Sequence, residues 1–241
     1  GREIPFLLLR CVDWVPQVRE RAESAIERRL STCAPELFVD VLPLVFRLEG
    51  TRQGQTSSAL GRLKTHLLES DAEPLVAGLH SLRWQVRHAS LKLLASGKAS
   101  LPEHELLRLV RDPHPAVADL AAKMLVGKLT SEEMGRHLDL LLSAPHPAVR
   151  ERLLTAAVSR GVPGIQPKLL VALNDSARRV RQVAQFHLRK ELAVDVAAHY
   201  LDQIPRSSGK RLAVALEGLG EASTSDHGHV ALPFISTGHP V

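Results

Sequence analysis

Aromatic residues are scarce in this 241-residue chain, where Phe, Trp and Tyr together make up 3% of the sequence. Strands of all-β proteins draw heavily on aromatic and β-branched side chains, so an all-β sandwich is not expected. Hydrophobic residues nevertheless reach 44%, carried by Leu, Val and Ala. That composition is typical of helices packed against one another in a globular protein.

Cysteine is equally rare, with only Cys11 and Cys33 present. Two cysteines are too few for a secreted disulfide framework, so a reducing compartment is expected. We interpret them as two thiols on helices, with a local disulfide as the alternative. Long apolar runs are also missing, because Arg10 interrupts the best candidate, residues 5–9. Without a secretion signal pattern either, the sequence predicts a cytoplasmic protein with no membrane partner.

A Val-Arg-like pair recurs with a period of 31 or 32 residues, and this repeat defines the expected organisation. The aligned valines are Val18, Val86, Val117, Val149 and Val180. Apolar residues follow each of them at helical spacing, and leucine clusters precede each of them. Each unit therefore predicts two antiparallel helices that must stack on the neighbouring unit to bury their apolar faces. The interval from Val18 to Val86 is twice as long, which leaves room for a degenerate unit.

The residues between the expected helices support the same alignment. Pro16, Pro115 and Pro147 stand two positions before the aligned valines, where a proline suits the first residue of a helix. An aspartate five residues before the valine can cap or close the turn. The predicted units are roughly 1–31, 35–69, 72–97, 102–128, 131–161, 164–191 and 194–220, followed by a partial unit at 226–241. In the degenerate unit, a helix over 37–48, a polar turn over 50–54 and a second helix ending near Leu63 are expected.

The last residues, 238–241, match the turn at 145–148 in register. The chain is therefore expected to stop within a repeat, as a fragment of a longer array. A natural C-terminus after a frayed terminal helix is the competing interpretation.

The recurring Asp-x-x-x-x-Val-Arg motif resembles the HEAT-repeat family, in particular its short bacterial units that are grouped with phycobilin-lyase-type repeats. The resemblance covers nearly the whole chain and implies an all-α fold, a right-handed α-solenoid of about seven stacked antiparallel helix pairs. It also implies a ladder of hydrogen bonds between Asp and Arg of successive repeats. The ladder residues would be Asp13, Arg19, Arg87, Asp112, Arg150, Asp175 and Arg181, with Asp13 matched to Arg19 and Asp175 to Arg181. Ser81 and Ala144 replace the aspartate, and Ala118 replaces the arginine, so the ladder is expected to be interrupted.

Positive charge is concentrated between residues 150 and 211, which hold 12 basic and 5 acidic residues. Three arginines crowd the first turn of an expected helix, where the helix dipole disfavours positive charge. An acidic partner or a phosphate backbone would offset that cost, and a solvated charged face is the alternative. The candidate partner or anion contacts are Arg150, Arg152, Arg178, Arg179, Arg181, Gln182, Gln185, Lys210 and Arg211. Arg21 and Lys92 are expected to be exposed on second helices in the same way.

The histidines are better explained by structural positions than by a metal site. His114, His146 and His239 each precede a proline, and successive repeats would hold them too far apart to share one metal ion. His187 falls on a core position. His227 and His229 fall in a polar stretch and are expected to belong to a loop. His104-Glu105 is a single dyad, whereas the iron-binding deoxyhypusine hydroxylase family, which is HEAT-like, repeats such dyads.

We therefore expect no metal, no cofactor and no small-molecule substrate. The predicted function is a non-enzymatic protein-binding or scaffolding module that presents a concave helical surface to a protein partner. Nucleic-acid binding through residues 150–211 is the first alternative. A DNA glycosylase is the second, because Trp14 with Asp13, and Trp84, superficially resemble the site of a HEAT-like glycosylase family.

Overall fold

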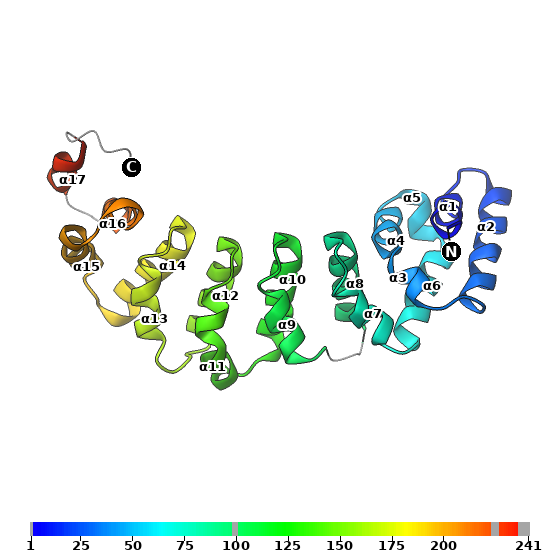
Figure 1. Ribbon diagram of the computed structural model, residues 1–241, viewed down its shortest axis with the longest axis horizontal. Coiled ribbons are helices and arrows are strands. Elements are labelled where there is room, and N and C mark those ends of the chain that lie inside the picture. Colours follow the sequence, from blue (N-terminus) through cyan, green and yellow to red (C-terminus); the bar gives the residue numbers. More distant parts are fainter. Residues whose placement is uncertain (1, 98–100, 223–226, 236–241) are drawn as a thin grey trace. The chain divides into compact units, whose positions relative to one another are not determined.

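The computed structural model describes residues 2–97, 101–222 and 227–235. Within these ranges the chain is built from helices joined by short turns, without a β-strand, which confirms the predicted all-α class. Two compact units divide the chain, Gly1–Met124 and Leu125–Val241. The boundary between them lies inside helix α10 (Pro115–Lys128), shown in green in Figure 1.

The first unit contains the helices up to α10. They are α1 (Ile4–Arg10), α2 (Pro16–Leu30), α3 (Glu36–Val39), α4 (Leu42–Glu49), α5 (Arg52–Thr56), α6 (Ser58–Glu69), α7 (Glu73–Gly78), α8 (Trp84–Ser96) and α9 (Glu103–Leu109). Helix α1 packs on α2, α2 on α6, and α4 and α7 on α8. These contacts bury the apolar stripe of each long helix, including Ala22, Ala25 and Ile26 of α2.

The degenerate unit differs from its prediction in two places. The helix expected over 37–48 is two helices, α3 and α4, because Pro43 occupies the first turn of α4 and cannot donate to a preceding carbonyl. The polar turn expected over 50–54 contains the start of helix α5, whose first turn is capped by the hydroxyl of Thr51, 3.1 Å from the amide nitrogen of Gly54. A Cβ on Gly54 would lie 1.9 Å from the carbonyl oxygen of Leu48, so glycine is required there.

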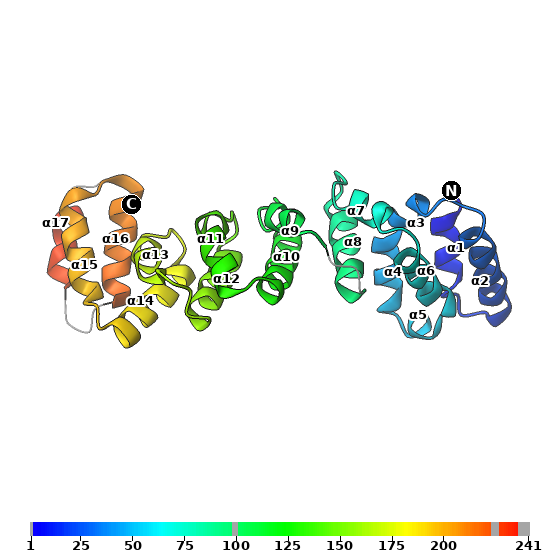
Figure 2. The same cartoon turned by 90° about the horizontal axis from the view of Figure 1, so that it is seen from below.

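The second unit continues as helix pairs. Its helices are α11 (Ser131–Leu142), α12 (Pro147–Ser159), α13 (Ile165–Ala172), α14 (Arg178–Leu192), α15 (Val196–Gln203), the 3-10 helix η1 (Ile204–Arg206), α16 (Gly209–Ala222) and α17 (Gly228–Ile235). Helix α12 packs against α11 and α14, and α14 packs against α13 and α16. Figure 2 shows these neighbours from below. The turn predicted at 238–241, which includes His239, lies outside the described residues.

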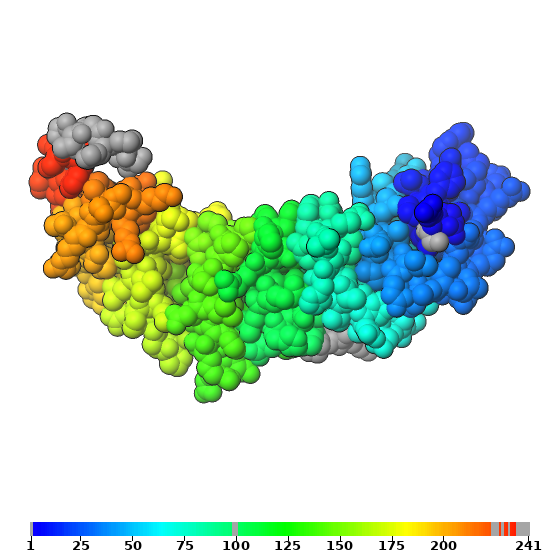
Figure 3. All heavy atoms as spheres, viewed as in Figure 1, coloured from blue at the N-terminus to red at the C-terminus, as the bar shows by residue number. Residues whose placement is uncertain are grey.

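Local signals set the helix boundaries in both units. Helices α2, α10 and α12 begin at Pro16, Pro115 and Pro147, as the repeat predicted. In the second unit the core is continuous from Leu154 on α12 to Leu219 on α16, and Val230 and Phe234 of α17 pack against it. Side chains fill the space between neighbouring helices of this unit in the space-filling view (Figure 3). Helix α14 is thereby held on both flanks, which fixes the direction of its outward side chains.

Candidate functional site

Four arginines at the aligned Val-Arg position share one hydrogen-bond geometry. Arg19 donates from Nη1 to the carbonyl oxygens of Asp13 and Trp14, at 2.8 and 3.2 Å. Arg87, Arg150 and Arg181 each donate in the same way to the carbonyls six and five residues upstream, at 2.8 to 3.3 Å. The first role of this arginine is therefore to close the turn that precedes its own helix.

The contacts of Arg19 and Arg181 correct the expected pairing within a repeat. Arg19 binds the backbone oxygen of Asp13, and the Asp13 carboxylate instead accepts from Arg10 at 2.8 Å and from the amide of Val15 at 3.0 Å. Arg181 likewise binds the backbone oxygen of Asp175, at 3.0 Å. The aspartate carboxylate turns away because it caps the backbone two residues further along the chain.

Carboxylate contacts instead join successive helix pairs, 25 residues apart. Arg87 donates from Nε and Nη2 to both oxygens of Asp112, at 2.7 and 2.8 Å. Arg150 binds Asp175 identically, at 2.8 and 2.7 Å. Both are bidentate, charge-assisted pairs at partly buried positions. Arg150 was a candidate for binding an external anion, but its guanidinium is already engaged in this pair.

The Arg87–Asp112 pair makes a pH-dependent contribution to stability. Burial by itself would raise the pKa of Asp112, but hydrogen bonds from Arg87 and the His114 amide outweigh it, and the pKa is lowered. A carboxyl with a lowered folded-state pKa stabilises the fold above its unfolded pKa of about 3.9, and this contribution is lost as the pH falls through the folded value.

We therefore expect Asp112→Asn to lower the free energy of unfolding at pH 7 and to reduce its decline between pH 5 and pH 2. Urea unfolding across that pH range measures both effects. Asp71→Asn is the matched control, because Asp71 accepts from a backbone amide on an exposed turn and has no arginine contact among the described residues. Equal acid sensitivity of Asp112→Asn and the unmodified protein would contradict the assignment.

Arg181 is the most buried charged residue in the described part of the second unit, with a side-chain exposure of 1%. Its guanidinium contacts two glutamates of α16, Glu217 at 2.9 Å and Glu221 at 2.6 Å. Burial opposes its charge, and the two carboxylates outweigh burial, so its pKa is raised. Arg181 was a candidate both for the structural ladder and for a partner contact. The partner contact is wrong, because these carboxylates hold Arg181 between α14 and α16.

Gln185 extends the same buried network. Its Nε2 atom lies 3.3 Å from Glu221 and 3.4 Å from the hydroxyl of Tyr200, which donates to the carbonyl of Leu173 at 2.8 Å. Burial raises the pKa of Tyr200 to about 12, so it remains a neutral donor. The prediction that Gln185 is an exposed contact residue is also wrong. This network joins α13, α14, α15 and α16 through polar groups in the interior.

The other basic residues that were candidate contacts are exposed, and two of them have carboxylate partners within the chain. Arg178 lies 3.6 Å from Glu221, and Arg179 lies 3.0 Å from Glu151 of α12. Carboxylates within the chain thus compensate the three arginines in the first turn of α14. Arg152, Lys210 and Arg211 are exposed, as are Arg21 and Lys92 in the first unit. The continuous basic stripe expected from the sequence is divided by these ion pairs.

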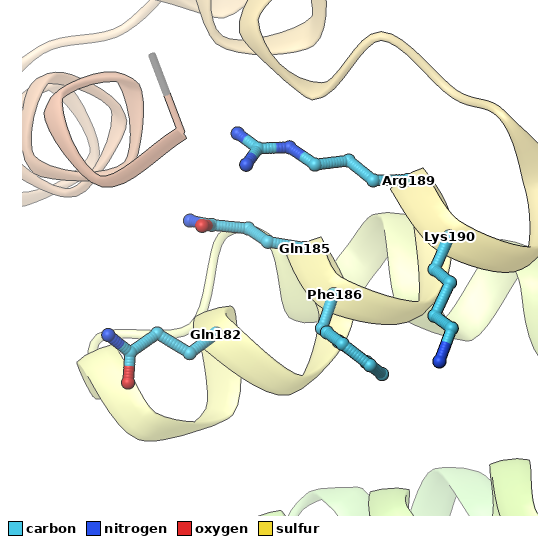
Figure 4. A pocket seen from close by; sticks show the side chains of 5 residues that line it. All are labelled: Gln182, Gln185, Phe186, Arg189 and Lys190. Atoms are coloured by element: carbon cyan, nitrogen blue, oxygen red, sulfur yellow. The ribbon is translucent and has the colours of Figure 1, made fainter. Parts of the chain in front are cut away.

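The exposed side of α14 carries a pocket of about 440 Å³, which we call the α14 groove. Its lining residues are Gln182, Gln185, Phe186, Arg189 and Lys190. Figure 4 shows Gln185 and Arg189 pointing to one side, and Phe186 and Lys190 to another. Phe186 is 53% exposed. The Lys190 ammonium lies 5.1 Å from the centre of its ring, a cation–π contact.

Sequence reasoning identified only the two glutamines of this groove. Phe186, Arg189 and Lys190 were missed, although Gln182, Phe186 and Lys190 recur at intervals of four residues and so share one helix face. Arg189 also donates to the carbonyl of Ala222 at the end of α16. A guanidinium has five N–H donors, so this contact leaves other donors on a side chain that lines the groove.

The histidine turns have structural contacts. His114 stacks on Trp84, with ring centroids 3.5 Å apart and planes inclined by 7°. Its Nδ1 accepts from the amide of Ala116 at 3.3 Å. His187 is partly buried and contacts Glu191 at 2.9 Å. His227 and His229 flank the start of α17, with ring centroids 6.3 Å apart.

Glu105 contacts His80, His104 and Arg108, the nearest atoms being the Arg108 guanidinium nitrogen at 2.8 Å. Across the described residues, no group of three or more His, Cys, Asp or Glu side chains is arranged to hold a metal ion. The residues considered for a glycosylase site have other contacts or are isolated. Asp13 binds Arg10, Trp84 stacks on His114, and Trp14 is 82% exposed.

None of the helices in the described ranges has the length and apolar character needed to cross a bilayer. Comparison with protein-family models and with curated proteins finds no match to this chain. The α14 groove brings together an exposed aromatic ring, the exposed amide of Gln182 and positive charge.

Proposed function

We propose that this chain is a non-enzymatic protein-binding module, a right-handed α-solenoid of HEAT type that acts in the cytoplasm. Its partner contacts the outward side chains of second helices, with the α14 groove as the main contact in the second unit. The repeated arginine geometry, shared by Arg19, Arg87, Arg150 and Arg181, supports the solenoid interpretation because stacked repeats produce such periodic contacts.

One observation carries the proposal: α14 is anchored to α16 on one side and exposed to solvent on another. Arg181 and Gln185 fix it to α16 through buried polar contacts. Phe186 stands exposed on the same helix between polar and basic neighbours. A rigidly supported aromatic residue within a polar rim is the arrangement found at the energetic centres of protein interfaces.

Site-specific photo-cross-linking tests the proposal in cell extract. A benzophenone amino acid at Gln182, exposed on α14, is expected to give a discrete cross-linked protein. The same group at Gln166, exposed on α13, is the matched control and is expected to give none. Phe186→Ala in the Gln182-labelled chain should weaken the product about tenfold, as expected when an aromatic anchor worth about 1.4 kcal/mol is lost. Equal labelling from both positions, or a product that survives Phe186→Ala, would contradict the proposal.

A further inference from the structure

We propose that the α14 groove binds an acidic peptide segment that carries an apolar side chain. This inference rests on the proposed function and specifies the chemistry of the partner. It follows from the three kinds of group that line the groove: two basic side chains, one exposed aromatic ring and the exposed amide of Gln182. Each kind matches a different part of such a peptide.

The positive charge of the groove is available to a ligand. Lys190 is exposed and contacts the ring of Phe186 rather than a carboxylate, and Arg189 is exposed and contacts a backbone carbonyl. The nearby acidic groups have contacts of their own: Glu221 with Arg181, Glu191 with His187, and Glu151 with Arg179. Carboxylates of a ligand would therefore meet Arg189 on one side of the helix and Lys190 on the other. Neither side chain has a carboxylate contact within the described chain, which favours an acidic segment by charge complementarity.

The uncharged groups define the rest of the ligand. Phe186 offers an exposed ring face on which an apolar or aromatic side chain can be buried. Gln182 is exposed and carries both a donor and an acceptor, which is the pattern that a peptide backbone presents in return. Carboxylate, apolar side chain and backbone amide are all present in a short acidic peptide.

A single-stranded nucleic acid would also combine negative charge with stackable rings, but the groove offers little for one. Sequence-tolerant strand binding uses several aromatic platforms and a basic track along the backbone. Here Phe186 is the one aromatic side chain of the groove, and the arginines at 150, 179 and 181 are paired with carboxylates. The observations therefore favour the peptide.

Fluorescence anisotropy with the whole chain tests the inference. The probe is a labelled peptide with three glutamates on each side of a Leu-Phe pair. It is expected to bind at least about tenfold more tightly than the same peptide with glutamine in place of glutamate, and binding should weaken with salt. Phe186→Ala and Lys190→Glu should each weaken binding about tenfold. Arg206→Glu makes the same charge change on η1 outside the groove and should leave binding unchanged.

Three results would overturn the inference: equal binding of the glutamate and glutamine peptides, equal loss with Arg206→Glu, or tighter binding of an oligothymidylate of similar length. Thermal unfolding of each variant checks that the fold is intact. If cross-linking from Gln182 succeeds and the acidic peptide does not bind, this inference fails and the protein-binding proposal stands. If cross-linking also fails, both fail.

Discussion

Replacing Arg181 with Ala is expected to destabilise the second unit by about 3–5 kcal/mol, the usual cost of removing one partner from a buried ion pair. The change leaves Glu221, whose side chain is 12% exposed, without its closest cation, and it also opens the turn at residues 175 and 176. Hydrogen–deuterium exchange of α14 and α16 measures the loss. Helices α4 and α8 of the first unit serve as an internal reference and should exchange as before.

Arg178→Ala is the control for this prediction. Arg178 lies three residues before Arg181 on α14 and also contacts Glu221, but its side chain is 71% exposed. Exposed ion pairs contribute about 0–1 kcal/mol, so exchange in α14 and α16 should hardly change. Similar exchange in Arg181→Ala and Arg178→Ala would show that Arg181 is not the structural centre of this region.

Gly218→Ala adds a single methyl group and is expected to lower the free energy of unfolding by about 1–3 kcal/mol, the usual cost of overpacking a core. A Cβ built at Gly218 would lie 2.3 Å from Cζ of Tyr200 and 2.6 Å from its hydroxyl oxygen. Tyr200 has no exposed surface and is held by hydrogen bonds to Leu173 and Gln185, so its ring cannot move aside freely. Thermal unfolding of Gly218→Ala, followed by circular dichroism, tests this expectation.

Gly220→Ala on the same helix provides a closely matched control. A Cβ there has no neighbour within 4 Å, and alanine favours the helix by about 0.5–1 kcal/mol. Opposite signs are therefore expected from the same substitution two residues apart. In a Tyr200→Ala background, Gly218→Ala should lose its penalty, because the ring it meets is gone. An unchanged penalty in that background would show that the contact with Tyr200 is not the cause.

Local sequence signals predicted the helices outside the degenerate unit. Proline at the first helical position correctly predicted where α2, α10 and α12 begin. The apolar spacing after each aligned valine identified the buried faces, and the all-α class followed from them. Pro43 is also a local signal: a proline disfavours the helical conformation of the residue before it, and the expected helix over 37–48 is divided there into α3 and α4.

Contacts between distant residues could not be predicted from these signals. Arg181 and Gln185 lie on what the repeat predicts to be an exposed face, and their partners Glu217 and Glu221 are 36 and 40 residues away from Arg181. The resemblance implied a ladder between successive repeats, and Arg87–Asp112 and Arg150–Asp175 form such contacts, but the motif matched Asp13 with Arg19 and Asp175 with Arg181 inside one unit. Residues 150–211 were therefore predicted to form one basic surface. The structure shows buried arginines with structural contacts and, apart from them, the exposed α14 groove.

The central claim is that the arginines at the aligned Val-Arg position are structural, whereas the basic residues of the α14 groove contact a partner. Arginine side-chain NMR tests this claim most directly. Nε–H signals of the chain are recorded with and without the glutamate peptide. We expect Arg87, Arg150 and Arg181 to give protected signals that the peptide does not shift, and Arg189 to shift as the peptide binds. Rapid solvent exchange at Arg150 and Arg181 together with peptide-induced shifts there, and none at Arg189, would contradict the account.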